Sequence, residues 1–250
     1  MIKLKTAREL SVMKDACKIS ANALKLAGTL VKPGVSTLSI DTAVRKYIEG
    51  QGAIPSFLNY GGFPNSACIS VNNVVIHGIP SKKCILKSGD IVSVDVGAFY
   101  EGFHGDNAFT FKCGEVSKEA SDLLATTQES LLEGIKQAVP GNRIGDIGNA
   151  IQKYVEARNY SVVRDFVGHG VGAKLHEDPS VPNYGTSGRG VRLMVGMTLA
   201  IEPMINAGTH KVMVLDDDWT TVTSDGKLSA HFEHSIAITK DGPVILTIPD

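Results

Sequence analysis

The sequence predicts an α+β fold in which helices cover one face of a curved antiparallel sheet. Helix-like patterns come first and strand-like patterns follow, whereas an α/β protein would alternate them. This grouping occurs twice, in two halves that resemble each other. No linker or low-complexity stretch separates the halves, so we predict a single domain, 1–250, with pseudo-repeat halves of about 1–115 and 116–250.

The two halves align without gaps when the second is shifted by 107 residues. The matched positions include Pro33-Gly34 with Pro140-Gly141, Ile40 with Ile147, Ala43 with Ala150, Lys46-Tyr47 with Lys153-Tyr154, Glu49 with Glu156, Leu86 with Leu193, Gly89 with Gly196, and Asp95 with Glu202. A chance match is the alternative, but a repeat at a fixed period indicates repeated structural units. Two copies predict a pseudo-symmetric molecule with a site at the seam.

The helices can be placed by their caps and periodicity. Thr6 to Glu9 forms a capping box, and helical periodicity continues to about Val31 before Pro33-Gly34. Further helices are expected near 38–49, 118–138 and 145–158. Strands are expected near 67–71, 90–97, 106–112, 162–167, 197–202, 211–215, 219–223 and 231–238.

The composition argues against a nucleic-acid-binding, membrane-spanning or secreted protein. The 25 basic and 26 acidic residues nearly cancel, so nothing indicates a nucleic-acid surface or an anionic membrane partner. The charged N-terminus does not resemble a signal peptide, and no apolar run is long enough to span a membrane. The four cysteines have no CxxC spacing, which favours free thiols in a reducing cytoplasm over disulfides or a zinc site.

Four acids stand in apolar, strand-like surroundings, namely Asp95, Asp106, Glu202 and Glu233. Each could be an ordinary buried acid paired with a cation, or a turn residue. As a set they would repel one another strongly, and divalent metal ions would remove that repulsion. A hairpin that joins the strands of Asp95 and Asp106 would direct both carboxylates at one point.

His169 lies in a glycine-rich string, Gly168 to Gly172, that leaves its imidazole free to face a cavity. The string also matches a dinucleotide fingerprint, but the following KLHEDPSVP cannot begin a helix. We therefore interpret His169 as a fifth metal ligand.

The other histidines are less specific. His77 and His176 each precede turn-forming prolines, so we place them on loops at a cavity rim, although both could be ordinary loop residues. His231 would share one face of a strand with Glu233, and His234 would point away. His104 could support the site or lie at a sheet edge, and His210 is expected on a solvated turn.

These residues lie in strings that resemble the type I, bacterial-type methionine aminopeptidases, which have the pita-bread fold. The strings are CISVNNVVIHGIP, SGDIVSVDVGA, GDNAFTF, GHGVG, LHEDPSVPNYG, IEPM and SAHFEHSIAI, and the resemblance covers essentially all 250 residues. It implies two divalent metal ions, for which Mn, Co or Fe(II) would suit the carboxylate-rich ligand set at least as well as Zn.

The resemblance also implies a role for each site residue. Asp95 would chelate one metal, Asp106 and Glu233 would bridge, and His169 and Glu202 would complete the ligand shell of the other metal. Glu202 would accept a proton, His176 would donate to the carbonyl oxygen, and His77 would contact the substrate near its second residue. The methionine pocket would be formed by Phe57, Tyr60, Phe63, Cys68, Leu175 and Trp219, although these could simply be core residues.

Some positions depart from relatives. Phe57 stands where some carry a small residue, Leu175 where some carry phenylalanine, and His231 where glutamine is frequent. We expect His231 to hydrogen-bond to the site without ligating a metal. A Na⁺ or K⁺ site is also implied near Asn72, Val74 and Ser229.

The implied activity is removal of the initiator methionine from nascent proteins with a small second residue. We expect a cytoplasmic monomer that acts on nascent N-termini, with the ribosome as one place where it meets them. Two rivals stay open: a prolidase or Xaa-Pro aminopeptidase, which normally has an additional N-terminal domain, and a non-catalytic binding protein, which would be expected to lose ligands.

Overall fold

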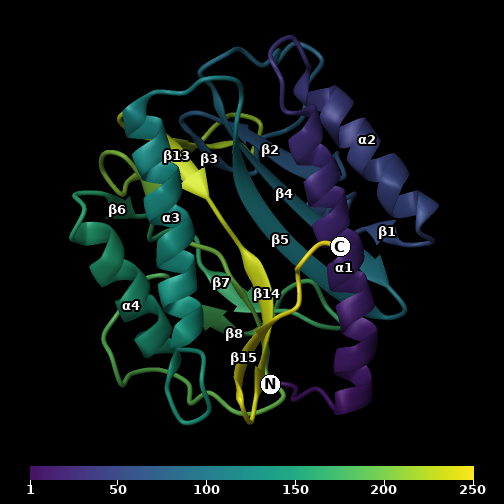
Figure 1. The fold of residues 1–250 in the computed structure, drawn as a ribbon, viewed down its shortest axis with the longest axis vertical. Helices are drawn as coiled ribbons and strands as arrows, with labels where there is room; N and C mark the ends of the chain where they lie inside the picture. Colours follow the sequence, from purple (N-terminus) through teal and green to yellow (C-terminus); the bar gives the residue numbers. More distant parts are fainter.

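Four α-helices form two pairs, one in each half of the molecule. The computed structural model describes all 250 residues. α1 (Ala7–Leu30) lies beside α2 (Thr37–Gly50), and α3 (Lys118–Lys136) lies beside α4 (Ile144–Glu156), with the strands between and behind the two pairs (Figure 1). The capping box predicted at the start of α1 is present, since Thr6 and Glu9 bond reciprocally.

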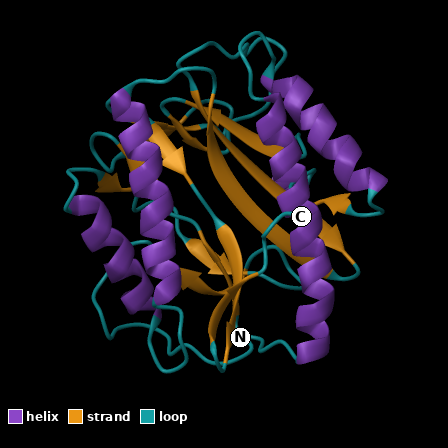
Figure 2. Cartoon of the chain, in the orientation of Figure 1, coloured by secondary structure: helices purple, strands orange, loops and turns teal.

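The strands form antiparallel sheets that curve between the helix pairs (Figure 2). In chain order they are β1 (Ile54–Pro55), β2 (Ala67–Val71), β3 (Val74–Ile76), β4 (Ile91–Tyr100), β5 (Phe103–Lys112), β6 (Ser161–Val162), β7 (Gly168–Gly170), β8 (Glu177–Val181), β9 (Thr198–Ile201), β10 (Met204–Asn206), β11 (Val212–Val214), β12 (Thr221–Thr223), β13 (Ser229–His231), β14 (His234–Thr239) and β15 (Gly242–Ile245), with a 3-10 turn at Tyr60–Gly62.

The pairing joins strands from both halves. β4 pairs with β1, β2 and β5, and the longest sheet has the order β15-β14-β9-β7-β8. The shorter sheets have the orders β13-β10-β6 and β11-β12-β3. One large apolar cluster lies under α1 and α2, another under α3 and α4, and the polar centre described below lies between them.

Hydrogen bonds repeat at the spacing found in the sequence. Gly34 N–H donates to the carbonyl of Leu86, and Gly141 N–H donates to that of Leu193, 107 residues further on. Both glycines have positive φ, 87° and 98°, which glycine adopts without strain. The predicted pseudo-two-fold α+β architecture is therefore confirmed, while the boundary near residue 115 stays a prediction.

Two predicted strands are wrong in extent. The strand expected at 162–167 ends at Val162, because its partner β10 is only three residues long and the ladder between them joins only Ser161 and Val162 to β10. The strand expected at 231–238 is broken at residues 232–233, because β13 pairs with β10 whereas β14 pairs with β9. The interruption frees Glu233 to pair with a third strand.

Several short strands were not predicted, namely β1, β3, β7, β8, β10 and β15. Segments of two to five residues are too short to show alternation. The four cysteines are free, as expected. None of the helices is both long and apolar enough to cross a bilayer.

Candidate metal centre

The β4–β5 hairpin presents Asp95 and Asp106 on one face of the sheet. Asp95 lies opposite Ala108, and Asp106 lies opposite Gly97. Directly opposed residues share a face, and so do residues two apart on one strand, so the two aspartates are diagonal neighbours. The predicted hairpin geometry is confirmed.

Glu233 joins this hairpin through the break between β13 and β14. Its N–H donates to the carbonyl of Ala108 at 2.9 Å, and Ala108 N–H donates back at 3.4 Å. Ser235 hydroxyl donates to the carbonyl of Asp106 at 2.7 Å. β14 is thereby held against β5, which places Glu233 level with Asp95.

Glu202 and His169 come from β9 and β7, which are neighbours in the longest sheet. His169 pairs with Ala200 in the ladder, and Glu202 follows directly after β9. His169 Nε2 lies 3.5 Å from Glu202 Oε1 and 3.8 Å from Asp106 Oδ2. One ligand atom from each of Asp106, His169 and Glu233 lies within 4.8 Å of the others.

The hydrogen bond of His169 fixes its tautomer. Nδ1 lies 2.8 Å from the carbonyl of Gly170, and a carbonyl can only accept, so Nδ1 carries the proton. Burial lowers the pKa of His169 to about 3, so its ring is neutral near pH 7. Nε2 therefore presents a lone pair to two carboxylates, which is repulsive unless a cation lies between them.

The four buried carboxylates likewise lack a positively charged partner. Burial raises the pKa of Asp95, Glu202 and Glu233 well above ordinary values, and that of Asp106 to about 7. Asp106 adds further repulsion to the other three. Buried oxygens of Asp95, Asp106 and Glu233 have no hydrogen-bond partner. No lysine or arginine pairs with the cluster, and hard divalent cations fit this donor set.

His77 and His176 both lie on loops at the cavity, as predicted, one after β3 and one before β8. The ring of His176 lies edge-on to that of His169, with centroids 4.2 Å apart. His77 has an unusual positive φ of 57°, and burial lowers its pKa to about 4. Both rings are neutral near pH 7, because burial lowers the pKa of His176 as well.

Sequence reasoning did not find the partner of His176. Its Nδ1 lies 2.7 Å from the hydroxyl of Tyr60, which is 116 residues away in the chain. Tyr60 was expected only as a pocket wall. The local pattern holds no signal for this bond, since the two residues meet only after the halves fold together.

Among the remaining histidines, the prediction for His231 is wrong in two respects, whereas the others lie as expected. His231 Nε2 lies 3.6 Å from Glu202 Oε2, too far for the predicted hydrogen bond, and it does not share an unbroken strand with Glu233. His234 points away and contacts Thr247, as expected. His104 contacts Ser56, and His210 lies on a bend.

All the candidate site residues line one cavity of about 180 Å³. Besides the polar groups, its walls are Phe57, Tyr60, Gly61, Phe63, Cys68, Leu175 and Trp219. Phe63 and Trp219 meet edge to face, with centroids 5.2 Å apart. The cavity therefore combines an acidic centre with a small apolar compartment.

Comparisons with known proteins agree with this arrangement. The sequence matches metallopeptidase family M24 over residues 11–240. It is 54% identical to the methionine aminopeptidase of Clostridium perfringens over 248 residues, 99% of each chain. It is 51% identical to methionine aminopeptidase 1 of Bacillus subtilis over 247 residues, again 99% of each.

Solved structures show the same fold. A methionine aminopeptidase from Thermotoga maritima superposes with a TM-score of 0.97 at 48% identity, covering 99% of both chains. A prolidase from Pyrococcus horikoshii shares the fold alone, with a TM-score of 0.79 at 22% identity over 64% of its length. With its fold, its acidic centre and these relatives, the chain belongs to metallopeptidase family M24, and within it to the methionine aminopeptidases.

Proposed function

We propose that this protein removes the N-terminal methionine from polypeptides whose second residue is small. The observation that carries the proposal is the convergence of five metal-ligand side chains and an apolar compartment in one cavity. The full-length relatives named above are methionine aminopeptidases, and they support the same activity. A prolidase-type activity has weaker support, because those structures share only the fold and are substantially longer.

Two divalent ions would be held by the five ligands. Asp95 and Asp106 of the β4–β5 hairpin would hold these ions together with His169, Glu202 and Glu233, which line the same cavity. Mn, Co, Fe(II) and Zn all accept such mixed carboxylate and imidazole ligands. When bound, the ions would activate a water and polarise the scissile carbonyl.

The protein's own groups would handle protons and orientation. Glu202 is suited to accept a proton, because burial raises its pKa above the usual carboxyl range. His176 would donate from Nε2 to the carbonyl oxygen as negative charge develops there, with Tyr60 donating to Nδ1 to hold that tautomer. His77, also at the cavity, would contact the second residue and exclude bulky ones.

The apolar compartment suits a methionine side chain. A thioether makes favourable contacts with aromatic rings, and Phe63, Trp219 and Phe57 line the wall. Leu175 completes the wall and is almost fully buried. The free α-amine of the substrate would lie near Asp95 and Asp106.

The test compares Met-Ala-Ser, Met-Lys-Ser and an Xaa-Pro dipeptide with Mn or Co present. We expect release of methionine from Met-Ala-Ser and little from Met-Lys-Ser. Equal rates for the first two would contradict the selectivity for a small second residue. Preferential cleavage of the Xaa-Pro peptide would replace the proposal with a proline-specific activity.

Further details belong to the same proposal. We assign the protein to the cytoplasm, acting as a monomer on nascent chains, with the ribosome as the place of encounter. We also assign a Na⁺ or K⁺ site near Asn72, Val74 and Ser229, where Ser229 N–H already bonds the carbonyl of Asn72 at 2.9 Å.

A further inference from the structure

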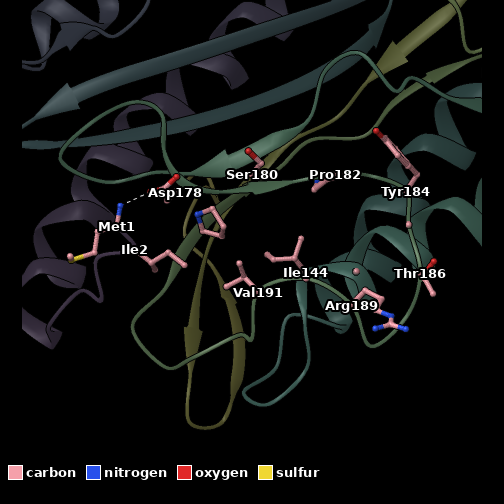
Figure 3. Close-up of a pocket in the computed structure, with 14 residues that line it drawn as sticks. Met1, Ile2, Ile144, Asp178, Ser180, Pro182, Tyr184, Thr186, Arg189 and Val191 are labelled. Atoms are coloured by element: carbon pink, nitrogen blue, oxygen red, sulfur yellow. Dashed lines mark hydrogen bonds and ion pairs between the residues drawn. The ribbon is translucent and has the colours of Figure 1, made fainter.

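Two hollows continue outward from the candidate metal centre along β8. The first, of about 520 Å³, is lined by His169 and His176, which also line the catalytic cavity, and by Lys3 and Lys174. The second, of about 720 Å³, shares Met1, Asp178 and Ser180 with the first (Figure 3). We name the two together the β8 groove.

The far part of the β8 groove is mainly apolar. Ile2, Ile144 and Val191 point into it from one side, and Pro182 and Tyr184 line the other (Figure 3). Arg189 lies at this end. The groove thus leads from the catalytic histidines to an apolar section bordered by a guanidinium group.

The catalytic cavity is too small to hold a whole polypeptide substrate, so most of the substrate must lie outside it. At about 180 Å³ it can enclose only the first part of a polypeptide. The chain beyond the scissile bond must leave past the rim, and His169 and His176 belong both to that rim and to the β8 groove. An extended chain advances about 3.3 Å per residue, so roughly five further residues would follow a strand as long as β8.

β8 is also suited to receive an extended chain. It is the last strand of its sheet and pairs only with β7. Outside that ladder, Asp178 and Ser180 make no backbone hydrogen bond. A free strand edge offers peptide groups to an incoming extended segment.

The charges of the β8 groove favour an acidic occupant. Its two acids are already paired, Glu177 with Lys5 at 2.6 Å and Asp178 with the N-terminal amine at 2.5 Å. Lys3, Lys174 and Arg189 form no ion pair. The uncompensated charge along the groove is therefore positive.

We propose that the β8 groove binds the residues of the polypeptide substrate that follow the scissile bond, from the third to about the seventh. It favours acidic side chains near Lys3 and Lys174 and an apolar side chain against Ile144, Tyr184 and Val191. This inference rests on the proposed aminopeptidase activity, and it adds a preference that the methionine pocket cannot supply.

The first test varies the length and charge of the peptide. Met-Ala-Ser sets the baseline, and eight-residue peptides extend it with Asp and Glu, or with Lys and Arg, at positions three to five. We expect KM to be about threefold to tenfold lower for the acidic peptide than for the basic one. The difference should shrink at high salt, where exposed charges are screened. A KM that does not depend on the length or charge of the peptide would overturn the proposal that the β8 groove binds the substrate.

Variants locate the effect. Lys3→Glu, an exposed residue that lines the part of the groove nearest the catalytic cavity, should reduce or invert the preference for acidic peptides. Lys46→Glu, on the exposed side of α2 across the molecule from the groove, is the matched control and should leave it unchanged. Melting curves verify that both variants fold. Equal effects of the two variants would contradict the assignment.

Crosslinking separates failure of this inference from failure of the activity. A peptide with a benzophenone amino acid at the sixth position is irradiated together with the His176→Ala variant, in which we expect turnover to be too low to consume the peptide. Crosslinks to β8 or to residues 184–191 support the groove, and crosslinks elsewhere overturn it. Failure of the unmodified protein to cut Met-Ala-Ser would instead reject the proposed activity, whatever the crosslinks show.

Discussion

At the scale of single residues, His169 shows most directly why the centre requires cations. Its Nδ1–H is committed to the carbonyl of Gly170, so the lone pair on Nε2 must face Glu202 and Asp106. Protonating Nε2 would relieve the repulsion, but burial opposes it and lowers the pKa to about 3. A divalent ion satisfies the imidazole and both carboxylates at once.

His176 is predicted to act on the developing oxyanion. Replacing it with alanine should lower turnover by roughly 10²-fold, as expected for the loss of one oxyanion donor. Metal affinity should stay nearly unchanged, because His176 lies beside His169 and is not among the five ligands. Steady-state kinetics of His176→Ala check this, with His210→Ala as the control on an outlying bend. An unchanged turnover would remove His176 from the mechanism.

Tyr60 is predicted to orient His176. Tyr60→Phe keeps the aromatic wall of the pocket but deletes the hydroxyl that lies 2.7 Å from Nδ1. We expect kcat to fall by about tenfold, comparable with one hydrogen bond to a group that gains charge, while KM changes little. If KM rises instead and kcat is unchanged, Tyr60 is only a pocket wall.

At the scale of elements, the position of the β4–β5 hairpin depends on its contact with α1. At Gly105, next to Asp106, a Cβ would lie 2.4 Å from Cα of Cys17 in α1. No side chain fits there without moving the helix or the strand. The glycine therefore sets the distance between α1 and the strand that carries a metal ligand.

Gly105→Ala is predicted to destabilise the protein by about 1–3 kcal/mol, the usual cost of overpacking. It should also weaken metal binding, because β5 must shift at Gly105, directly before the metal ligand Asp106. Urea unfolding and metal titration measure the two effects. Gly50→Ala is the matched control, since a Cβ at the end of α2 meets nothing within 4 Å. Equal stability of the two variants would show that α1 does not position β5.

The elements also show what the sequence can and cannot predict. Grouped helices and strands, the capping box at Thr6 and the repeat reveal the α+β class, because these signals are local or periodic. Acids in apolar strands identify the metal centre, because burying a carboxylate is costly unless it is paired or binds a cation. The break before His234 is not visible, since its cause is a change of pairing partner far away in the chain. The Tyr60–His176 bond and the β8 groove are hidden for the same reason.

At the scale of the whole molecule, the site lies where the two halves meet. Asp95 and Glu202, equivalent in the repeat, come from the two halves and line the same cavity. Each half has its own apolar cluster under its helix pair. Ions held between the halves would therefore stabilise the native state against unfolding, since the unfolded chain has no such site.

This coupling predicts a pH-dependent effect of metal on stability. Burial raises the pKa of Asp106 from 3.8 to about 7, so its contribution to metal-free stability is complete below about pH 4 and is lost as pH rises through 7. Metal binding needs the ionised carboxylate. His169 is neutral throughout this range, because its pKa is about 3. The rise in Tm caused by Mn²⁺ should therefore be larger at pH 7.5 than at pH 5.5.

Thermal melts with and without Mn²⁺ at the two pH values make this measurement. Asp106→Asn is the control, because it keeps the shape of the side chain but cannot ionise, and its Tm should respond little to Mn²⁺ at either pH. An equal or larger response of the unmodified protein at pH 5.5 would contradict the assignment of Asp106.

The most direct measurement is anomalous diffraction at the manganese absorption edge from crystals soaked in Mn²⁺. The structure predicts two peaks inside the cavity, surrounded by Asp95, Asp106, His169, Glu202 and Glu233. An empty cavity, or manganese bound only elsewhere on the molecule, would contradict the assignment of these five side chains as a metal centre.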